Sequence, residues 1–345
     1  MSGVVRAATN ELAELLRRLL TVDGARTALD GDGRAAVERA VLWVLQAEAI
    51  GARRFGIAMV LRERAGSGSG APPVGARPGQ SSSGAVRSLD AAAVPGIIAL
   101  SRAVGAAVES GREFGVGVVG VQHAGATGML GCAVRSIASE GLVGVVAAQS
   151  APIVAPWGGV RPVIGTNPIA VAAPRLQGPP LVVDSATAPL TFADLREHAA
   201  RSEPLPEGVA LDASGHGTTD PSEVAALVPS ARLGSLVGLA VELLAGVAAG
   251  SSFEPGAAPT AARGLLVIAL DPTRAGGTDA AELTARLSAR WVAAGGHLPG
   301  RLDALPHAIE GFAAEMDVDA DTLHSLRVAV SEEAAADHGR TTDAR

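Results

Sequence analysis

The stretch APIVAPWGG occupies residues 151–159, and GTNPIA follows at residues 165–170. Within the second segment, Asn167 and Pro168 are residue types that set a turn, and the glycine before them supplies backbone freedom. The apolar residues 169–173 then predict a short strand. We therefore interpret the GTNP loop as an architectural turn that enters a strand, and not as a set of catalytic side chains.

A further strand is predicted at residues 181–183, and it ends at Asp184, which is followed by the small residues Ser185 and Ala186. An aspartate at a strand end, followed by small residues, can receive ribose hydroxyls while the backbone approaches a pyrophosphate. The alternative is that Asp184 only caps the following turn. The residues alone leave both interpretations open.

Hydrophobic periodicity divides the rest of the chain. Helices are predicted within residues 10–65, at 97–110, 129–140, 236–247 and 280–294, and again from 305. Inside the first of these segments, residues 30–33 predict a turn that also provides an N-cap. The other strands are predicted at 115–121, 142–148 and 264–270. Residues 67–84, rich in Gly, Ser and Pro, predict a loop, and the polar tail 337–345 predicts disorder.

The length of 345 residues predicts two domains. We expect an α+β protein in which residues 1–66 and 305–345 form one helical domain. The loop 67–84 would lead from it into a central sheet domain at residues 85–304.

The segment GVGVVG at residues 115–120 matches the dinucleotide-binding pattern GxGxxG. That pattern works where its first glycine turns a strand into a helix, whose N-terminus meets the pyrophosphate. Here the glycines lie inside a Val-rich strand, and no helix is predicted before residue 128. We interpret them as packing glycines.

Composition excludes several classes of function. The chain has a net charge of −7 and no lysine, so we expect no nucleic-acid binding, no Schiff-base lysine and no P-loop. A lone cysteine, Cys132, excludes a disulfide within the chain, and the histidines are scattered singly, so no metal site is expected. No apolar run is long enough for a membrane span and no signal peptide is visible, so we expect a cytoplasmic protein.

The segments at 151–159 and 165–170 resemble the SxPxxAPxGG and GTNPIAxAxP signature of the malate/L-lactate dehydrogenase-like family of NAD(P)-dependent oxidoreductases. This family includes ureidoglycolate dehydrogenases, diketogulonate reductases and piperideine-carboxylate reductases. Other segments resemble its motifs in the same order: DSAT at 184–187, LPEG at 205–208, TTDP at 218–221, VELLAG at 241–246, IALDP at 268–272 and LPG at 298–300.

The resemblance implies a non-Rossmann α+β fold, in which a central mixed sheet binds NAD(P)H and is flanked by a helical domain formed from both termini. It also implies a homodimer with active sites near the subunit interface, acting on a small-molecule substrate. Carried over by position, the cofactor-binding candidates are Ser150, Asp184, Ser185, Ala186, Gly234, Pro299 and Gly300.

The chain departs from the family where the acid–base chemistry is expected. The family motif DSHG falls on residues 53–56, where Arg54 replaces the serine and Phe55 replaces the histidine. A second family histidine, in VRNSNHFGAAG, falls on Ala126 in an ungapped alignment, and His123 lies three residues earlier; with a gap, His123 itself would align. The basic residue of the family's RGK segment is Asp194 here.

Hydride reduction of a ketone leaves an alkoxide that must be protonated. A side chain positioned to donate this proton accelerates the reaction by a factor of roughly 10²–10⁴. An iminium substrate already carries its proton, so imine reduction tolerates the loss of the histidines better. We therefore expect a divergent reductase of a small keto or imino acid, favouring the imine. In it His123 replaces the acid and Arg54 holds a substrate carboxylate. The alternatives are that His123 is a capped strand-end histidine and that Arg54 is a solvated helix-end charge.

Two other functions stay open, because a fold does not fix a chemistry. The chain can be a non-redox enzyme (a lyase, isomerase or cyclase) or an inactive family member that acts as a dimeric partner. If it binds a nicotinamide, the cofactor is NAD or NADP, and Asp194 favours NADH because an acid repels a 2′-phosphate.

Overall fold

The computed structural model describes residues 3–21, 31–66, 80–92, 94–251, 263–277 and 279–343. Its centre is a seven-stranded sheet of order β2-β3-β4-β10-β5-β6-β7. The strands are β2 (Gln80–Ser83), β3 (Val86–Asp90), β4 (Val116–Ala124), β5 (Val143–Ala148), β6 (Ile169–Ala173), β7 (Leu181–Ser185) and β10 (Arg263–Leu270). Only β3 and β4 pair in parallel, and the other neighbours are antiparallel. The α+β class with a mixed, non-Rossmann sheet is therefore confirmed.

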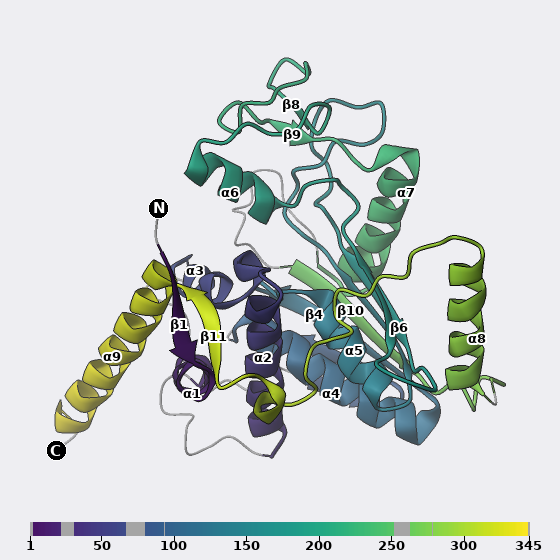
Figure 1. Cartoon of the computed structure of the whole chain (residues 1–345), viewed down its shortest axis with the longest axis horizontal. Coiled ribbons are helices and arrows are strands. Elements are labelled where there is room, and N and C mark those ends of the chain that lie inside the picture. Colours follow the sequence, from purple (N-terminus) through teal and green to yellow (C-terminus); the bar gives the residue numbers. More distant parts are fainter. Residues whose placement is uncertain are drawn as a thin grey trace.

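Helices cover both faces of this sheet (Figure 1). They are α4 (Gly96–Phe114), α5 (Leu130–Ser139), α7 (Ala231–Val241), the π-helix η3 (Glu242–Val247) and α8 (Ala280–Ala293). Gly117 and Gly120 show why the glycines of β4 are needed. A Cβ at Gly117 would lie 2.1 Å from the Ala107 carbonyl oxygen of α4, and one at Gly120 would contact Ala249 after η3. Because the two glycines face opposite sides of the strand, both are packing glycines, as predicted.

The helices of both termini flank the sheet on one side (Figure 1). They are α1 (Thr9–Leu20), α2 (Gly31–Ala49), the 3-10 helix η2 (Arg53–Phe55), α3 (Ile57–Gly66), the 3-10 helix η4 (Ile309–Gly311) and α9 (Ala320–Asp343). A small antiparallel sheet joins the two ends, since β1 (Val4–Ala8) pairs with β11 (Glu315–Asp319). In the described residues, none of the helices combines the length and apolarity needed to cross a bilayer.

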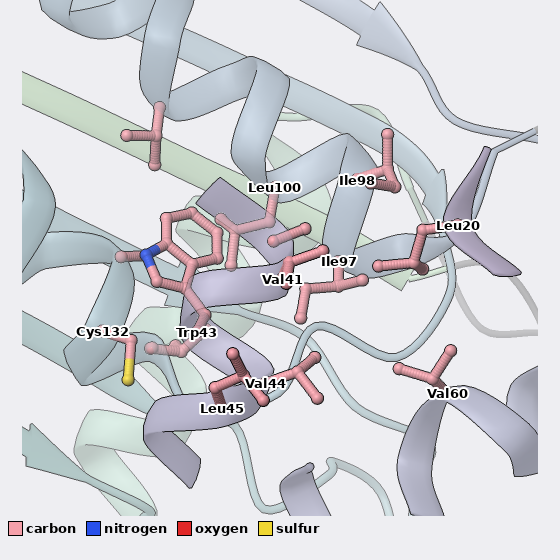
Figure 2. Packing of buried hydrophobic residues seen from close by; sticks show 14 of the residues in the cluster. Leu20, Val41, Trp43, Val44, Leu45, Val60, Ile97, Ile98, Leu100 and Cys132 are labelled. Carbon is pink, nitrogen blue, oxygen red and sulfur yellow. The ribbon is translucent and has the colours of Figure 1, made fainter. Parts of the chain in front are cut away.

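Aliphatic side chains of α2 and α4 form a large part of the main core, which also includes side chains of α1, α3, α5 and the sheet strands (Figure 2). Val41 and Leu45 are fully buried and pack with Ile97 and Leu100. Trp43, one of the chain's few aromatic residues, is also buried, and its indole N–H donates to Ser136 Oγ at 3.0 Å. Such dense aliphatic packing compensates for an aromatic content of 2%.

A smaller lobe lies above the sheet in Figure 1 and contains α6 (Phe192–Arg201), β8 (Ala210–Leu211) and β9 (Ala226–Leu227). It has a hydrophobic core of its own, formed by Ile153, Val154, Ile164, Ala188, Leu195, Leu205, Ala210 and Leu227. The two segments 151–159 and 165–170 therefore lead from the main sheet into this lobe and back.

Several sequence-based expectations were wrong. Gln80–Ser83 is a strand and not part of a loop, and the rest of the predicted loop, 67–79, lies outside the described residues. Residues 31–33 already belong to α2. The tail that was predicted to be disordered continues helix α9 through Asp343, and it directly follows the helix-favouring run EEAAA at residues 332–336. Strand β11 was missed, since its partner β1 lies at the other end of the chain.

Candidate active site

The segment that aligns with the family's DSHG motif is the 3-10 helix η2, and a buried carboxyl group supports it. Glu48 near the end of α2 is 4% exposed, and its Oε1 accepts the Ile57 N–H at 2.8 Å. A Cβ on Gly56 would lie 2.2 Å from the same oxygen, so a larger residue there would displace the Glu48 carboxylate. Burial raises the pKa of Glu48 to about 7, against the opposing effects of the Ile57 N–H and Arg53.

The loop at residues 125–129 lies directly on η2. A Cβ on Gly128 would come within 3.4 Å of the Phe55 carbonyl oxygen. Glu63 of α3 fixes the start of this loop, because its Oε1 accepts the N–H groups of Ala126 at 3.1 Å and Gly96 at 2.9 Å. Burial raises the pKa of Glu63, and these N–H groups and a nearby arginine oppose the rise. The backbone of Ala126, which only the ungapped alignment puts at the position of a family histidine, thus serves to anchor the loop.

Arg54 makes its closest charged contacts with acidic residues of the small lobe. Its Nε lies 2.8 Å from Asp194 Oδ1 and its Nη1 lies 3.9 Å from Glu197 Oε2. The first contact is an ion pair and not an aligned hydrogen bond, because the donor geometry is poor. Asp194 also accepts the Thr191 N–H at 2.8 Å in a capping box at the start of α6. Arg54 is therefore not a freely solvated charge.

His123 lies near the end of β4 with φ of 57°, in the left-handed region that non-glycine residues seldom occupy. Its Nδ1 is 2.9 Å from Asp90 Oδ1, and about half of each side chain is exposed. The Ala92 N–H and His123 together lower the pKa of Asp90. The structure therefore brings His123 together with an orienting carboxylate that the sequence had not singled out.

Asp184 caps a helix of another segment. Its Oδ2 accepts the Gly131 N–H at 2.8 Å, in the first turn of α5. The residue as a whole is exposed, but surrounding chain desolvates the carboxyl group enough to raise its pKa, which Gly131 and Arg301 oppose. The adjacent Ser185 is exposed, and its hydroxyl donates to the Ala186 carbonyl oxygen at 2.9 Å.

Two other predicted cofactor segments converge on the same region. A Cβ on Gly234 of α7 would lie 2.5 Å from the Thr187 carbonyl oxygen, so α7 packs closely on the DSAT segment. Pro299 and Gly300 are exposed, and the nearby Leu302 reaches the first turn of α5. Asp184 and the segment that contains Pro299 and Gly300 therefore meet at the first turn of α5, and Gly234 lies beside Thr187, the residue after Ala186.

Ser150 belongs instead to a buried polar network. Its N–H donates to Asn167 Oδ1 at 3.0 Å, and its Oγ accepts the Asn167 N–H at 3.2 Å. The Asn167 amide also donates to the Gly238 carbonyl oxygen at 3.0 Å and to Glu242 Oε2 at 2.8 Å. Since Asn167 is fully buried, the network supports an architectural role for the GTNP loop.

Residues 28–304 match the family model described as malate/L-lactate dehydrogenase. The chain belongs to this family. Delta(1)-pyrroline-2-carboxylate reductase 1 of Burkholderia ambifaria is 40% identical over 177 residues, which are 48% of this chain and 52% of that protein. (2R)-3-sulfolactate dehydrogenase (NADP(+)) of Chromohalobacter salexigens is 39% identical over 186 residues, covering 50% and 55%. The matched part of the chain thus spans about half the length of each of these curated relatives.

A solved family structure, delta1-piperideine-2-carboxylate reductase from Pseudomonas syringae pv. tomato, superposes with a TM-score of 0.76 at 27% identity. The match covers 94% of this chain and 99% of that one. The fold that the motifs implied is thereby confirmed over nearly the whole chain.

The nicotinamide dinucleotide typical of the malate/L-lactate dehydrogenase family fits the convergent region on chemical grounds. Asp184 uses Oδ2 for Gly131 and has Oδ1 as a further acceptor for ribose hydroxyls. Ser185, Ala186 and Gly300 are small, and among the described residues Asp303 alone approaches a Cβ built on Gly300. A dinucleotide backbone can therefore approach the chain closely here.

Sequence reasoning missed Asp90, Glu48 and Glu63 as parts of this site. Nothing local marks them, since each acts on a residue or loop that another element supplies. The start of α6 carried a usable signal, because Thr191 and Asp194 have the spacing of a capping box.

Proposed function

We propose that this family member is an NAD(P)H-dependent oxidoreductase that reduces a small imino or keto acid, with imines favoured over ketones. Family membership supports the redox chemistry, and relatives of known name include both imine reductases and hydroxy-acid dehydrogenases. The bound nicotinamide would supply the hydride, and Asp184 with its small neighbours would hold the ribose.

The observation that carries the preference for imines is the pair Phe55 and Ala126. Neither side chain can donate a proton, and both lie where the family's histidines are expected. The contact of Gly128 with Phe55 and the anchoring of Ala126 by Glu63 keep these segments together. An iminium substrate already carries a proton and does not need a proton donor at these positions. For a ketone, such a donor contributes a factor of roughly 10²–10⁴ in rate.

The remaining proton donor that we propose is His123. Asp90 contacts Nδ1 of the His123 imidazole and so fixes the orientation of the ring, which turns Nε2 towards a second partner. Histidines held by a carboxylate in this way are effective general acids and bases. The unusual φ of His123 is of the kind that persists at functional sites. Arg54 would orient a substrate carboxylate only by exchanging it for Asp194.

We further propose a homodimer. The continuous helix formed by α7 and η3 exposes an apolar stripe at helical spacing: Leu233, Leu236, Leu239, Leu243, Leu244 and Val247, with exposures from 39% to 71%. Contiguous apolar faces of this kind mark protein–protein contacts, and a two-fold contact would cover the stripe of both subunits.

The first test is a fluorescence titration of the pure protein with NADH and NADPH. Saturable binding of either supports the oxidoreductase, with NADH expected to bind more tightly. Initial rates with Δ1-pyrroline-2-carboxylate and with pyruvate then compare imine and ketone reduction. A higher kcat/KM for pyruvate would refute the preference for imines.

The second candidate function is a non-redox enzyme or an inactive dimeric partner. The Arg54–Asp194 pair favours it, because Asp194 already pairs with Arg54, the side chain that would otherwise hold a substrate carboxylate. The absence of NADH and NADPH binding at millimolar concentration would leave only this candidate.

A further inference from the structure

Two side-chain amides meet at Glu242, the residue where helix α7 changes into the π-helix η3. Gln149 donates from Nε2 to Glu242 Oε1, and Asn167 donates from Nδ2 to Glu242 Oε2 at 2.8 Å. One amide directly follows strand β5 and the other belongs to the GTNP loop, so a single carboxylate joins three segments. Turns of π-helix are frequent at functional sites.

The orientation of both amides is set by backbone N–H groups on their far sides. Gln149 Oε1 accepts the Gly264 N–H at 3.0 Å, and Asn167 Oδ1 accepts the Ser150 N–H at 3.0 Å. Each amide therefore turns its NH2 group towards residue 242. The side chain at this position has to accept on both sides, which a carboxylate does and a glutamine does not.

The backbone of Asn167 adopts a conformation that depends on such contacts. Its φ is 31°, in the left-handed region, and the residue is fully buried. Its N–H donates to Ser150 Oγ at 3.2 Å, and its side-chain amide also donates to the Gly238 carbonyl oxygen at 3.0 Å. A sparsely populated backbone conformation persists only where the surrounding contacts determine it. The contact with Glu242 therefore helps to hold the GTNP loop in its shape.

The GTNP loop in turn positions the DSAT segment. The Thr166 carbonyl oxygen, one residue before Asn167, accepts both the N–H and the hydroxyl of Thr187, at 3.0 and 2.9 Å. Thr187 is buried and directly follows Ala186, a member of the candidate cofactor segment. Glu242 is thereby connected to this segment through two consecutive loop residues and Thr187.

We infer that Glu242 is a positioning residue for dinucleotide binding. It acts on the cofactor through other residues, because it fixes Asn167 and thereby the contacts of Thr166 with Thr187 beside residues 184–186. The inference rests on the proposed function, which assigns the cofactor ribose to Asp184 and its small neighbours. It gives the VELLAG motif and the GTNP loop one shared role, namely to set the DSAT segment in the shape that binds the cofactor.

The first test exchanges the two partners of the network. In Glu242→Gln one NH2 group faces another, and NADH binding in a fluorescence titration should weaken about three- to tenfold, as expected for the loss of one hydrogen bond. Adding Gln149→Glu to this variant reverses the roles of the pair, so that every donor again faces an acceptor. The double variant should bind NADH as the wild type does. Failure of the exchange to restore binding, or unchanged binding in Glu242→Gln, would overturn the inference.

Val44→Ala is the control for a general loss of stability. Val44 on α2 is fully buried in the main core, where it contributes packing and not a contact of the Glu242 network. The variant should unfold at lower urea concentration than the wild type and keep its NADH affinity within about twofold. If it weakens NADH binding as much as Glu242→Gln at a similar loss of stability, the effect is general and the inference is wrong.

Hydrogen exchange of the cofactor-free proteins tests the positioning without a nicotinamide. The Thr187 N–H should exchange several-fold faster in Glu242→Gln and regain its protection in the double variant, while peptides of α4 stay unchanged. Equal exchange of Thr187 in all three proteins would contradict the inference. If Glu242→Gln alone does not fold, the double variant decides, and it must fold and bind NADH as the wild type does.

The two possible failures are distinguishable on the same set of proteins. A wild type that binds neither NADH nor NADPH refutes the oxidoreductase, and with it any role of Glu242 in cofactor binding. A wild type that binds NADH, together with unchanged binding and exchange in Glu242→Gln, refutes the role of Glu242 alone.

Discussion

Replacing Glu48 by glutamine should stabilise the protein at high pH and not at low pH. Glu48 is 4% exposed, and its folded pKa is about 7 against an ordinary value of 4.5. Between these values the unfolded chain has released a proton that the folded protein retains. The burial of Glu48 therefore costs no unfolding free energy below pH 4.5, and the free energy of unfolding falls as the pH rises from there to about 7.

The size of this effect follows from the shift itself. A pKa of about 7 in place of 4.5 corresponds to a loss of roughly 3 kcal/mol of unfolding free energy by pH 8. Glutamine keeps an oxygen for the Ile57 N–H at 2.8 Å, so the support of η2 survives. The glutamine has no proton to lose, so the variant should not show this decline.

The assay is urea unfolding of both proteins at pH 5, 6, 7 and 8 with the same buffers and ionic strength. The free-energy difference between variant and wild type should grow towards high pH by about 2–3 kcal/mol. Glu310→Gln, an exposed acid on η4, serves as the control and should follow the wild type. Parallel curves for Glu48→Gln and wild type would show that Glu48 is ionised at no cost, and the reasoning about its burial would be wrong.

Three further outcomes follow from the packing. Cys132 is buried and its pKa is raised to about 12, so Ellman's reagent should react only after denaturation; rapid labelling of the native protein would contradict this. Gly234→Ala should cost about 1–3 kcal/mol in urea unfolding, because its Cβ meets the Thr187 carbonyl oxygen, and an unchanged midpoint would disprove that close approach. Desolvation and the charge of Arg135 lower the pKa of His307, so the unfolded chain takes up a proton first as the pH falls below 6.5. Wild type should lose stability there relative to His307→Asn, and identical acid profiles would exclude this contribution.

Five of the seven strands of the central sheet were predictable from sequence because they are short apolar runs bounded by turn residues, whereas the polar strands β2 and β3 were not. The boundaries of Ile169–Ala173 agree with the prediction, and Gly141 ends α5 as expected, with φ of 82°. Periodicity reports such local patterns directly. Strand β11 has no such signal, since its pairing depends on a strand at the other end of the chain.

The candidate site was predictable only where motifs identify residues. Asp184 and Gly234 were found through their motifs, and the structure places both beside Thr187 or α5. The pairing of Arg54 with Asp194 was not predictable, because no local pattern links residues from η2 and α6. The role of His123 stays a prediction, although Asp90 gives it a defined orientation.

The pairing of β1 with β11 constrains the order in which the molecule can be built. Thr9 donates from Oγ1 to the Ala313 carbonyl oxygen across 304 positions of chain. On the ribosome, β1 therefore waits unpaired until β11 has emerged. The helices packed around this pair can reach their final arrangement only after synthesis has passed β11, so this region should gain protection from proteolysis later than the central sheet in a nascent chain.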